Sequence, residues 1–242
     1  VTRALAGLAQ IDAKRVAQRL VGYTDLSHRP TTQRYLALIA AESEDEHAQR
    51  GGQPYPFFLA HPLQQPLEQF DAVLGAASDW LVEWKWDGIR AQLVKRDGRL
   101  WLWSRGEELI TERFPELHDL AEALPDGTVI DGELVAWKEP ATDSETVFGI
   151  QPFALLQQRI GRKTLSKKLL EDVPAALLAY DLLEWRGEDW RSRPQDERRA
   201  RLELLVAEVG DGRLQLSPQL TGSDWQDFAR QREASRELGV EG

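Results

Sequence analysis

The chain has 242 residues, a formal net charge of −10 at pH 7 and no cysteine. This acidic balance argues against nonspecific duplex binding by the whole surface, since such binding rests on many lysine and arginine contacts to phosphate. The lack of cysteine excludes disulfides and thiolate zinc sites, and no apolar run approaches the roughly 18 residues of a membrane span.

The first 53 residues predict a small all-α segment. Apolar residues recur at helical spacing over residues 1–23, with Asp12 available as an N-cap, which predicts two short helices. Residues 34–41 predict another helix, and the polar stretch 42–53, with its Gly51-Gly52 pair, is typical of a linker. We therefore expect two units, residues 1–53 and residues 54–242.

The second unit mixes strands and helices. Strand-like runs occur at 81–84, 91–94 and 100–104, and Asp97-Gly98 predicts a hairpin turn between the last two. Residues 114–124 predict a helix, 128–137 and 175–183 predict strands, and 193–209 and 225–238 predict amphipathic helices. Because there is no regular βαβ alternation, we expect an α+β fold of antiparallel sheets flanked by helices.

Lys85 lies in the strongest local motif, Glu83-Trp84-Lys85-Trp86-Asp87-Gly88-Ile89-Arg90. At average residue usage, Lys-x-Asp-Gly followed by this arginine arises by chance in roughly a few chains per thousand of this length. We expect the bracketing tryptophans to bury Lys85, and burial beside positive charge lowers the pKa of an amine, which makes it nucleophilic. The alternative is a lysine on a solvated strand face, paired with Asp87 or Glu83.

Further segments follow in the order of a known superfamily. They are Trp103-Ser104-Arg105-Gly106, Asp131-Gly132-Glu133-Leu134-Val135, Ala179-Tyr180-Asp181-Leu182-Leu183 and Val240-Glu241-Gly242. Together with the Lys85 motif they resemble the motifs of ATP-dependent DNA ligases, which are covalent nucleotidyltransferases. Phe58-Leu59-Ala60-His61-Pro62 and Ile150-Gln151-Pro152-Phe153 also resemble DNA-ligase stretches, and the helices before Gly51 resemble the end of a helical DNA-binding domain.

The resemblance implies a reaction with ATP and Mg²⁺. Lys85 would attack the α-phosphate of ATP to form lysyl-AMP, and the AMP would pass to the 5′-phosphate of nicked duplex DNA. Arg90 and Arg105 would hold ribose and phosphate, a task that suits a charged, planar fork. The alternative for both arginines is surface ion pairing.

The remaining motif residues receive roles from the same resemblance. Glu133 and Glu241 would hold the ribose hydroxyl and Mg²⁺, which prefers hard oxygen ligands. Tyr180 would stack on adenine, and Glu83 would read the base edge. The alternatives are a plain hairpin turn at Asp131-Gly132 and ordinary core packing for Tyr180.

One dense basic cluster is our candidate for contact with the DNA backbone. Its members are Arg159, Arg162, Lys163, Lys167 and Lys168. The alternative is a solvated charge run with no ligand.

The chain departs from the family at its end, since the last nucleotidyltransferase motifs and the OB-fold domain that follow Glu241-Gly242 in relatives are absent. Methionine is also absent, even at position 1, so we interpret the chain as a fragment, weakly active or inactive by itself. We expect a monomer in a bacterial-type cytoplasm, associated with the nucleoid.

Three other functions compete with this interpretation. An RNA ligase or capping-type nucleotidyltransferase would share the Lys85 motif, but it should lack the helical leader. A noncatalytic nucleic-acid-binding module of the same fold would not need Lys85 together with Arg90, Arg105 and Glu133. An NAD-dependent ligase would carry a different preceding domain.

Overall fold

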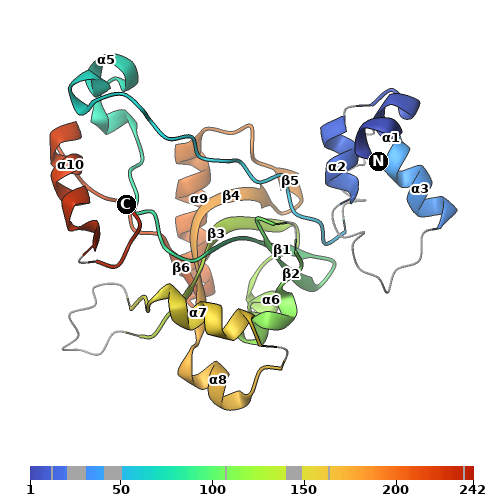
Figure 1. Ribbon diagram of the computed structural model, residues 1–242. Helices are drawn as coiled ribbons and strands as arrows, with labels where there is room; N and C mark the ends of the chain where they lie inside the picture. The colour runs from blue at the N-terminus through green and yellow to red at the C-terminus, as the bar shows by residue number, and fades with distance from the viewer. Residues whose placement is uncertain are drawn as a thin grey trace.

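The computed structural model describes residues 1–11, 13–20, 31–40, 51–106, 108–139, 149–162, 164–236 and 238–242. Three short helices open the chain: α1 (Thr2–Ala9), α2 (Ala13–Leu20) and α3 (Thr32–Ile39). They pack on one another and lie to one side of the central sheet (Figure 1). The predicted helices are confirmed, with Thr31 as the N-cap of α3; the proposed cap Asp12 lies outside the described residues.

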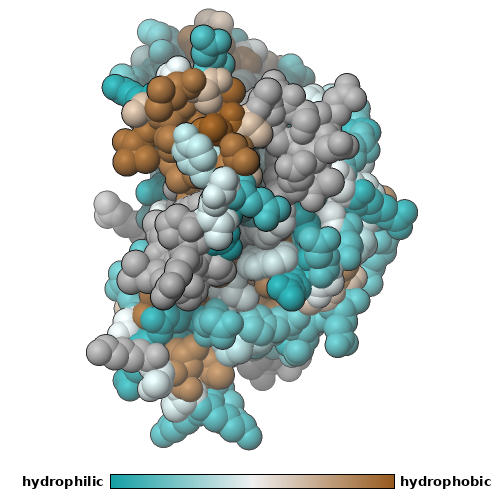
Figure 2. All heavy atoms as spheres, turned by 90° about the vertical axis from the view of Figure 1, so that its right-hand side faces the viewer, coloured by the Kyte–Doolittle hydropathy of each residue, from teal (hydrophilic) through white to brown (hydrophobic). Residues whose placement is uncertain are grey.

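The helices α1 to α3 leave apolar side chains on their outer surface. Val1 is 93% exposed and Leu8 is 80% exposed, and Leu36 of α3 is also exposed. Seen from their side of the molecule, apolar residues gather in one patch over this part of the chain (Figure 2). Among the described residues, no helix has both the length and the apolar character needed to cross a bilayer.

A six-stranded sheet forms the centre of the second unit (Figure 1). Its strands are β1 (Ile89–Arg96), β2 (Arg99–Ser104), β3 (Thr128–Ala136), β4 (Ala175–Trp185), β5 (Glu188–Asp189) and β6 (Leu214–Leu216). The order β2-β1-β3-β4-β5 is antiparallel throughout, while β6 pairs with β4 in parallel. The sheet with its flanking helices confirms the α+β fold.

The first hairpin follows from its turn. Asp97 and Gly98 both have positive φ, 49° and 71°, as the tight connection between β1 and β2 requires. Aspartate and glycine are residue types that adopt this conformation at low cost. The pair therefore fixes the register of β1 against β2, in which Leu93 faces Leu102.

Alternation along the strands gives the sheet one apolar face. Ala91, Leu93 and Ile130 are fully buried there, because successive side chains of a strand point to opposite faces. The helices α6 (Leu120–Ala123), α7 (Phe153–Ile160) and α9 (Gln195–Val209) cover this face with Leu120, Leu156, Leu202 and Leu205. The main hydrophobic core therefore lies between the sheet and these helices.

The opposite face is divided. Val94, Trp103 and Val129 form a small apolar cluster toward one end, and Trp84 and Val135 belong to another toward the other end. Between them the even-numbered residues of β1 and the odd-numbered residues of β3 are polar. Arg90 lies opposite Glu133, and the neighbouring pair is Gln92 with Asp131. This polar strip holds the candidate site.

Two β-bulges in β4 shape the same face. Asp131 pairs with Asp181 and Gly132 with Ala179, so Tyr180 is an extra residue; a second irregularity makes Leu183 extra. Bulges place two residues opposite one and re-aim a side chain. Tyr180 and Asp181 therefore both reach the polar strip, although a regular strand would send one of them to the core.

A second helical group packs beside the sheet. It contains η1 (Leu67–Gln69), α5 (Phe70–Leu74), η2 (Ala77–Asp79), α10 (Trp225–Glu233) and η5 (Ala234–Arg236). The ring of Trp225 contacts Phe70, Trp80 and Phe228 edge-on or tilted, and its Nε1 donates to the carbonyl of Gly75 at 2.9 Å. Trp225 therefore joins α10 to the α5 region.

Three sequence expectations were wrong in detail. Residues 114–124 form the turns η4 (Pro115–Leu117) and α6, preceded by η3 (Thr111–Arg113), in place of one helix. Residues 81–84 contain a single bridge, Glu83 to Gln219, and no strand. The helix expected over 225–238 ends as α10 at Glu233 and continues as a 3-10 turn. The turn α8 (Lys167–Asp172) lies between α7 and β4.

Candidate functional site

The backbone of Lys85 forms two hydrogen bonds with the last two residues of the chain. Its amide donates to the carbonyl of Gly242 at 2.6 Å, and its carbonyl accepts from the amide of Glu241 at 2.9 Å. The side chains of Lys85 and Glu241 form an ion pair, with Lys85 72% exposed and Glu241 43% exposed. The two outermost motifs of the sequence therefore meet in space.

The expected burial of Lys85 is wrong. The neighbouring Trp84 and Trp86 are buried in the second apolar cluster, and Trp86 donates to the hydroxyl of Ser217 at 3.0 Å. Because alternate residues of an extended chain face opposite ways, the tryptophans direct Lys85 outward. The amine is therefore accessible to a ligand, and its charge is balanced by a carboxylate.

Gly88 brings the lysine motif against β3. A Cβ at this position would lie 2.3 Å from the carbonyl oxygen of Leu134 and 2.8 Å from Cγ of Glu133. No residue other than glycine fits without moving that backbone. The glycine of Lys-x-Asp-Gly thus allows the lysine loop to approach Glu133 closely.

Glu133 is the carboxyl on which the candidate residues converge. Burial raises its pKa to about 7, assisted by Asp131, while the positive charges of Arg90, Lys85 and Arg105 act in the opposite direction. Each of these groups is close enough to influence the ionisation of the carboxyl. Arg90 also lies opposite Glu133 in the sheet, and the amide of Arg105 donates to the carbonyl of Arg90 at 3.0 Å. Residues selected from three separate motifs therefore lie near one carboxyl.

Arg90 is held by Asp131 across the sheet. Its Nη2 donates to Oδ2 at 3.0 Å and its Nε to Oδ1 at 3.3 Å. Burial raises the pKa of the Asp131 carboxyl, which is 4% exposed, and Arg90 opposes this change. Asp131 and Gly132 lie inside β3, so the alternative of a hairpin turn is excluded.

Tyr180 faces the same strip because of its bulge. Its hydroxyl donates to Oδ1 of Asp131 at 3.4 Å, and the guanidinium carbon of Arg90 lies 6.0 Å from the ring centroid. Burial raises the pKa of the phenol. The ring is therefore part of the polar strip and is not simply packed in the core.

Glu83 extends the site toward α9. Arg199, which is 4% exposed, donates to Glu83 at 2.7 Å and to the carbonyl of Ser217 at 2.6 Å. Burial raises the pKa of Glu83, and Arg199 opposes the change. Glu83 also lines a largely apolar pocket of about 580 Å³, with Trp84, Leu220, Trp225 and Phe228 among its walls.

Sequence reasoning missed two arginines of α9 at this site and gave no role to Asp181. Arg198 binds Asp181 through two hydrogen bonds of 2.8 and 3.0 Å, and Asp181 faces Asp131 across the sheet. Asp181, Arg198 and Arg199 therefore extend the series of paired acidic and arginine side chains beyond Asp131. No local spacing reveals Arg198 and Arg199, because α9 reaches the site only through the fold.

The basic cluster separates into two groups. Arg159 is completely buried; it pairs with Glu116 at 2.5 Å and donates to the carbonyls of Arg113 and Val173. The expectation that Arg159 contacts DNA is therefore wrong, since its donors are used inside the core.

The other members lie on or near the surface. Arg162, Lys167 and Lys168 are exposed, and Lys167 is 3.8 Å from Glu171. Lys163 lies outside the described residues. Among the described side chains there is no group of three or more histidine, cysteine or acidic residues arranged to hold a metal by themselves.

Comparisons with known proteins agree on one family. The family model described as "ATP dependent DNA ligase domain" matches residues 58–242. A DNA ligase from Aeropyrum pernix is 37% identical over 182 residues, covering 72% of this chain and 28% of the relative. A probable DNA ligase from Opitutus terrae is 43% identical over 137 residues, covering 56% of this chain and 13% of the relative.

Solved structures give the same result. The mycobacterial DNA ligase D complexed with ATP and MES has 32% identity and a TM-score of 0.52, and the match covers 69% of this chain and 48% of that one. The ligase domain from M. tuberculosis LigD has 30% identity, the same TM-score and the same coverage. The chain thus spans less than half of these proteins.

Proposed function

Because the chain belongs to the ATP-dependent DNA ligase domain family, we propose that it forms a lysyl-AMP on Lys85 and passes the AMP to nicked DNA. The observation that carries the proposal is the position of Glu133, which lies opposite Arg90 in the sheet and against Gly88 of the Lys85 motif. Arg105 joins them through the hydrogen bond from its amide to the carbonyl of Arg90. An exposed amine beside fixed cationic and acidic groups is what in-line attack on a phosphate requires.

The proposed reaction has three steps. The Nζ of Lys85 loses a proton and attacks the α-phosphorus of ATP; a P–N bond forms, the bond to the bridging oxygen breaks, and pyrophosphate leaves. An oxygen of the 5′-phosphate at a nick then displaces the lysine and takes the AMP. Finally the 3′-hydroxyl attacks that phosphate, the nick closes and AMP leaves.

The surrounding residues have distinct tasks in this proposal. Arg90 and Arg105 bind ribose or phosphate oxygens, to which a guanidinium donates in parallel pairs. Tyr180 stacks on the adenine, and Glu83, at the wall of a hollow, reads the base edge. In the absence of nucleotide, Glu241 balances the charge of Lys85.

Magnesium fits this site only together with the substrate. Glu133 and Glu241 supply hard carboxylate oxygens, whereas Mg²⁺ takes six ligands and usually completes them with water and phosphate oxygens. When bound, the ion neutralises phosphate charge. The lack of a larger acidic cluster among the described residues agrees with a shared site of this kind.

DNA contact is proposed for the exposed basic residues Arg162, Lys167 and Lys168, with Lys163 beside them in the sequence. In a chain of net charge −10, backbone contact must be local. We further propose that residues 1–53 are the end of a helical DNA-binding domain and that residues 54–242 form the adenylation unit. The names of the relatives favour DNA over RNA as the substrate.

The decisive experiment is covalent labelling. The 242-residue chain is incubated with Mg²⁺ and ATP labelled at the α-phosphate, and bound AMP is detected by intact mass and denaturing gel. We expect label, at a low level, on the wild type and on Lys138→Ala, which removes an exposed lysine outside the site, and none on Lys85→Ala. Label that persists on Lys85→Ala would refute the proposal, and so would the absence of label both from the 242-residue chain and from a chain extended beyond Gly242.

A further inference from the structure

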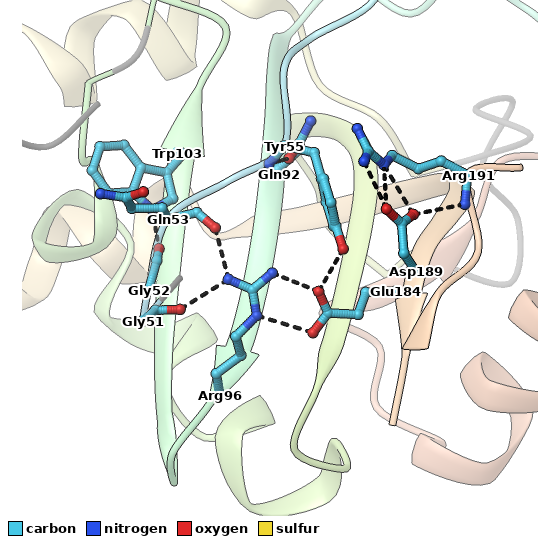
Figure 3. Close-up of polar contacts among 10 residues, drawn as sticks. All are labelled: Gly51, Gly52, Gln53, Tyr55, Gln92, Arg96, Trp103, Glu184, Asp189 and Arg191. Carbon is cyan, nitrogen blue, oxygen red and sulfur yellow. Dashed lines mark hydrogen bonds and ion pairs between the residues drawn. The ribbon is translucent and has the colours of Figure 1, made fainter. Parts of the chain in front are cut away.

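Residues 51–58, called here the anchored segment, run along β1 on the face that carries the candidate site. At its start, three successive carbonyls accept hydrogen bonds from the sheet. Arg96 donates to Gly51 and Gln53, both at 2.8 Å, and Trp103 Nε1 donates to Gly52 at 2.7 Å (Figure 3). Residues that the sequence places in a linker are therefore bound to the sheet.

Tyr55 is the anchor of this segment. It is 1% exposed, and its hydroxyl donates to Glu184 Oε2 at 2.7 Å. Glu184, itself 3% exposed, also accepts from Arg96 at 2.6 and 3.0 Å. The guanidinium of Arg191 lies 4.0 Å from the centroid of the tyrosine ring, and Asp189 holds Arg191 in place (Figure 3). The tyrosine is thus held by a hydrogen bond at its hydroxyl and by a guanidinium over the face of its ring.

The far end of the segment reaches the candidate site. Gln92 Oε1 accepts from the amide of Tyr55 at 2.8 Å. Two residues earlier in β1, Arg90 Nη1 donates to the carbonyl of Phe58, and the ring of Phe57 lies 5.7 Å from the guanidinium. Three side chains on one face of β1 therefore bind the anchored segment along its length. Arg96 binds its start, Gln92 binds Tyr55, and Arg90 binds Phe58 at the candidate site.

The contacts of Arg90 show what the segment does. Its Nε and Nη2 are used by Asp131, and its Nη1 is used by Phe58. The carboxylate and the carbonyl together fix the plane of the guanidinium. Phe58 is 74% exposed, so its own side chain does not hold the carbonyl in place, and the nearest buried residue of the segment is Tyr55.

We propose that Tyr55 is a positioning residue for Arg90, acting through the anchored segment. The catalytic consequence rests on the proposed adenylation function. Tyr55 lies ahead of Phe58, where the family match begins, so the unit that performs adenylation includes residues before that boundary. Release of the anchor frees the Phe58 carbonyl, broadens the orientation of Arg90 and weakens the binding of ATP.

The buried charges of the anchor agree with a positioning role. An arginine and a glutamate that are both nearly fully buried lose their hydration, and an apolar pair of similar volume often stabilises a protein at least as well. What a bidentate ion pair adds is a defined geometry. In this network that geometry fixes Gly51, Gln53 and Tyr55 relative to the sheet.

The test compares two buried aromatic residues on opposite faces of the sheet. Phe114 is 0% exposed in the main core, and Arg159 lies 4.8 Å from its ring centroid. Phe114→Ala therefore matches Tyr55→Ala in kind, without touching the anchored segment. Tyr55→Phe keeps the ring and removes the hydroxyl that donates to Glu184. Hydrogen exchange of residues 56–60 and 88–92 is measured without nucleotide, and KM for ATP and kcat are measured for lysyl-AMP formation.

We expect faster exchange in both peptides for Tyr55→Ala and not for Phe114→Ala. Loss of one charged hydrogen-bond contact predicts a KM for ATP about tenfold higher, equal to about 1.4 kcal/mol, with kcat within about threefold of the wild type. Tyr55→Phe should show a smaller change in the same direction, which covers the case in which Tyr55→Ala does not fold.

The outcomes separate the two proposals. Equal exchange of residues 88–92 in the wild type and the Tyr55 variants overturns the positioning role, whatever the adenylation activity. An equal rise of KM in Tyr55→Ala and Phe114→Ala overturns it as well. A wild type that exchanges as expected but forms no lysyl-AMP, either as the 242-residue chain or when extended beyond Gly242, instead overturns the proposed function.

Discussion

Glu133 should make the folded protein less stable as the pH rises. Its pKa is raised from 4.5 to about 7 by burial. Between these values the folded state retains a proton that the unfolded state releases, so stability falls with increasing pH. At about 1.36 kcal/mol per pH unit, the free energy of unfolding loses up to about 3 kcal/mol by pH 8, and this cost is absent below pH 4.5.

Replacing the carboxyl by an amide removes this titration. Glu133→Gln should match the wild type near pH 4.5 and exceed its free energy of unfolding by up to about 3 kcal/mol at pH 8. Urea unfolding without Mg²⁺, followed by tryptophan fluorescence at several pH values, measures the difference. Burial causes the rise in the pKa of Glu133, Asp131 adds to it, and Arg90, Lys85 and Arg105 oppose it. All four of these neighbouring groups are retained in the variant.

Glu122→Gln provides the control, since it removes an exposed carboxylate of α6. The difference in free energy of unfolding between Glu122→Gln and the wild type should not vary over the same pH range. The free energy of unfolding of Glu133→Gln, minus that of the wild type, should grow with pH. If this difference is constant, or shrinks as the pH rises, burial does not destabilise the ionised carboxylate. The described electrostatics of the site would then be incorrect.

Three further changes test other parts of the structure. Gly132→Ala should lower the free energy of unfolding by about 1–3 kcal/mol, because its Cβ would lie 2.6 Å from the carbonyl of Leu178, whereas Gly106→Ala should be nearly neutral in urea unfolding. Arg159→Ala should cost about 3–5 kcal/mol, since it leaves the carboxylate of Glu116 unpaired; an unchanged urea midpoint would contradict that role. Replacing Arg162, Lys167 and Lys168 by alanine should weaken nick binding and reduce the slope of log K against log salt by up to about 2.7. Fluorescence anisotropy measures that slope, Arg230→Ala on α10 should leave it unchanged, and an unaltered slope in the triple variant would remove these residues from the DNA surface.

Local rules predicted much of the sheet. The Asp97-Gly98 turn and the alternation on either side gave β1 and β2, and the long apolar runs gave β3 and β4. The helix expected over 114–124 failed because a proline at 115 begins a new turn there and the segment winds as short pieces. Residues 81–84 make only the single bridge from Glu83 to Gln219, and the alternation of apolar residues there did not distinguish a bridge from a strand.

The sequence likewise predicted some features of the candidate site and not others. Motif order selected residues that do converge, but alternation itself should have placed Lys85 opposite to Trp84 and Trp86 and so in solvent. The burial of Arg159 depends on Glu116, 43 residues away, and no local spacing encodes that pairing. Likewise, Arg198 and Arg199 reach Asp181 and Glu83 only after α9 has packed on the sheet.

The bulges in β4 bear on how the chain tolerates changes of length. A single-residue deletion at Tyr180 would remove the extra residue of the first bulge and leave Ala179 opposite Gly132 and Asp181 opposite Asp131, so that no residue changes face. A deletion at Leu177, where the pairing with β3 is regular, would instead move neighbouring residues of the strand to the opposite face. We therefore expect the effect of a deletion in β4 to depend on its position. A deletion scan through the eleven residues of the strand should show a larger loss of stability at Leu177 than at Tyr180.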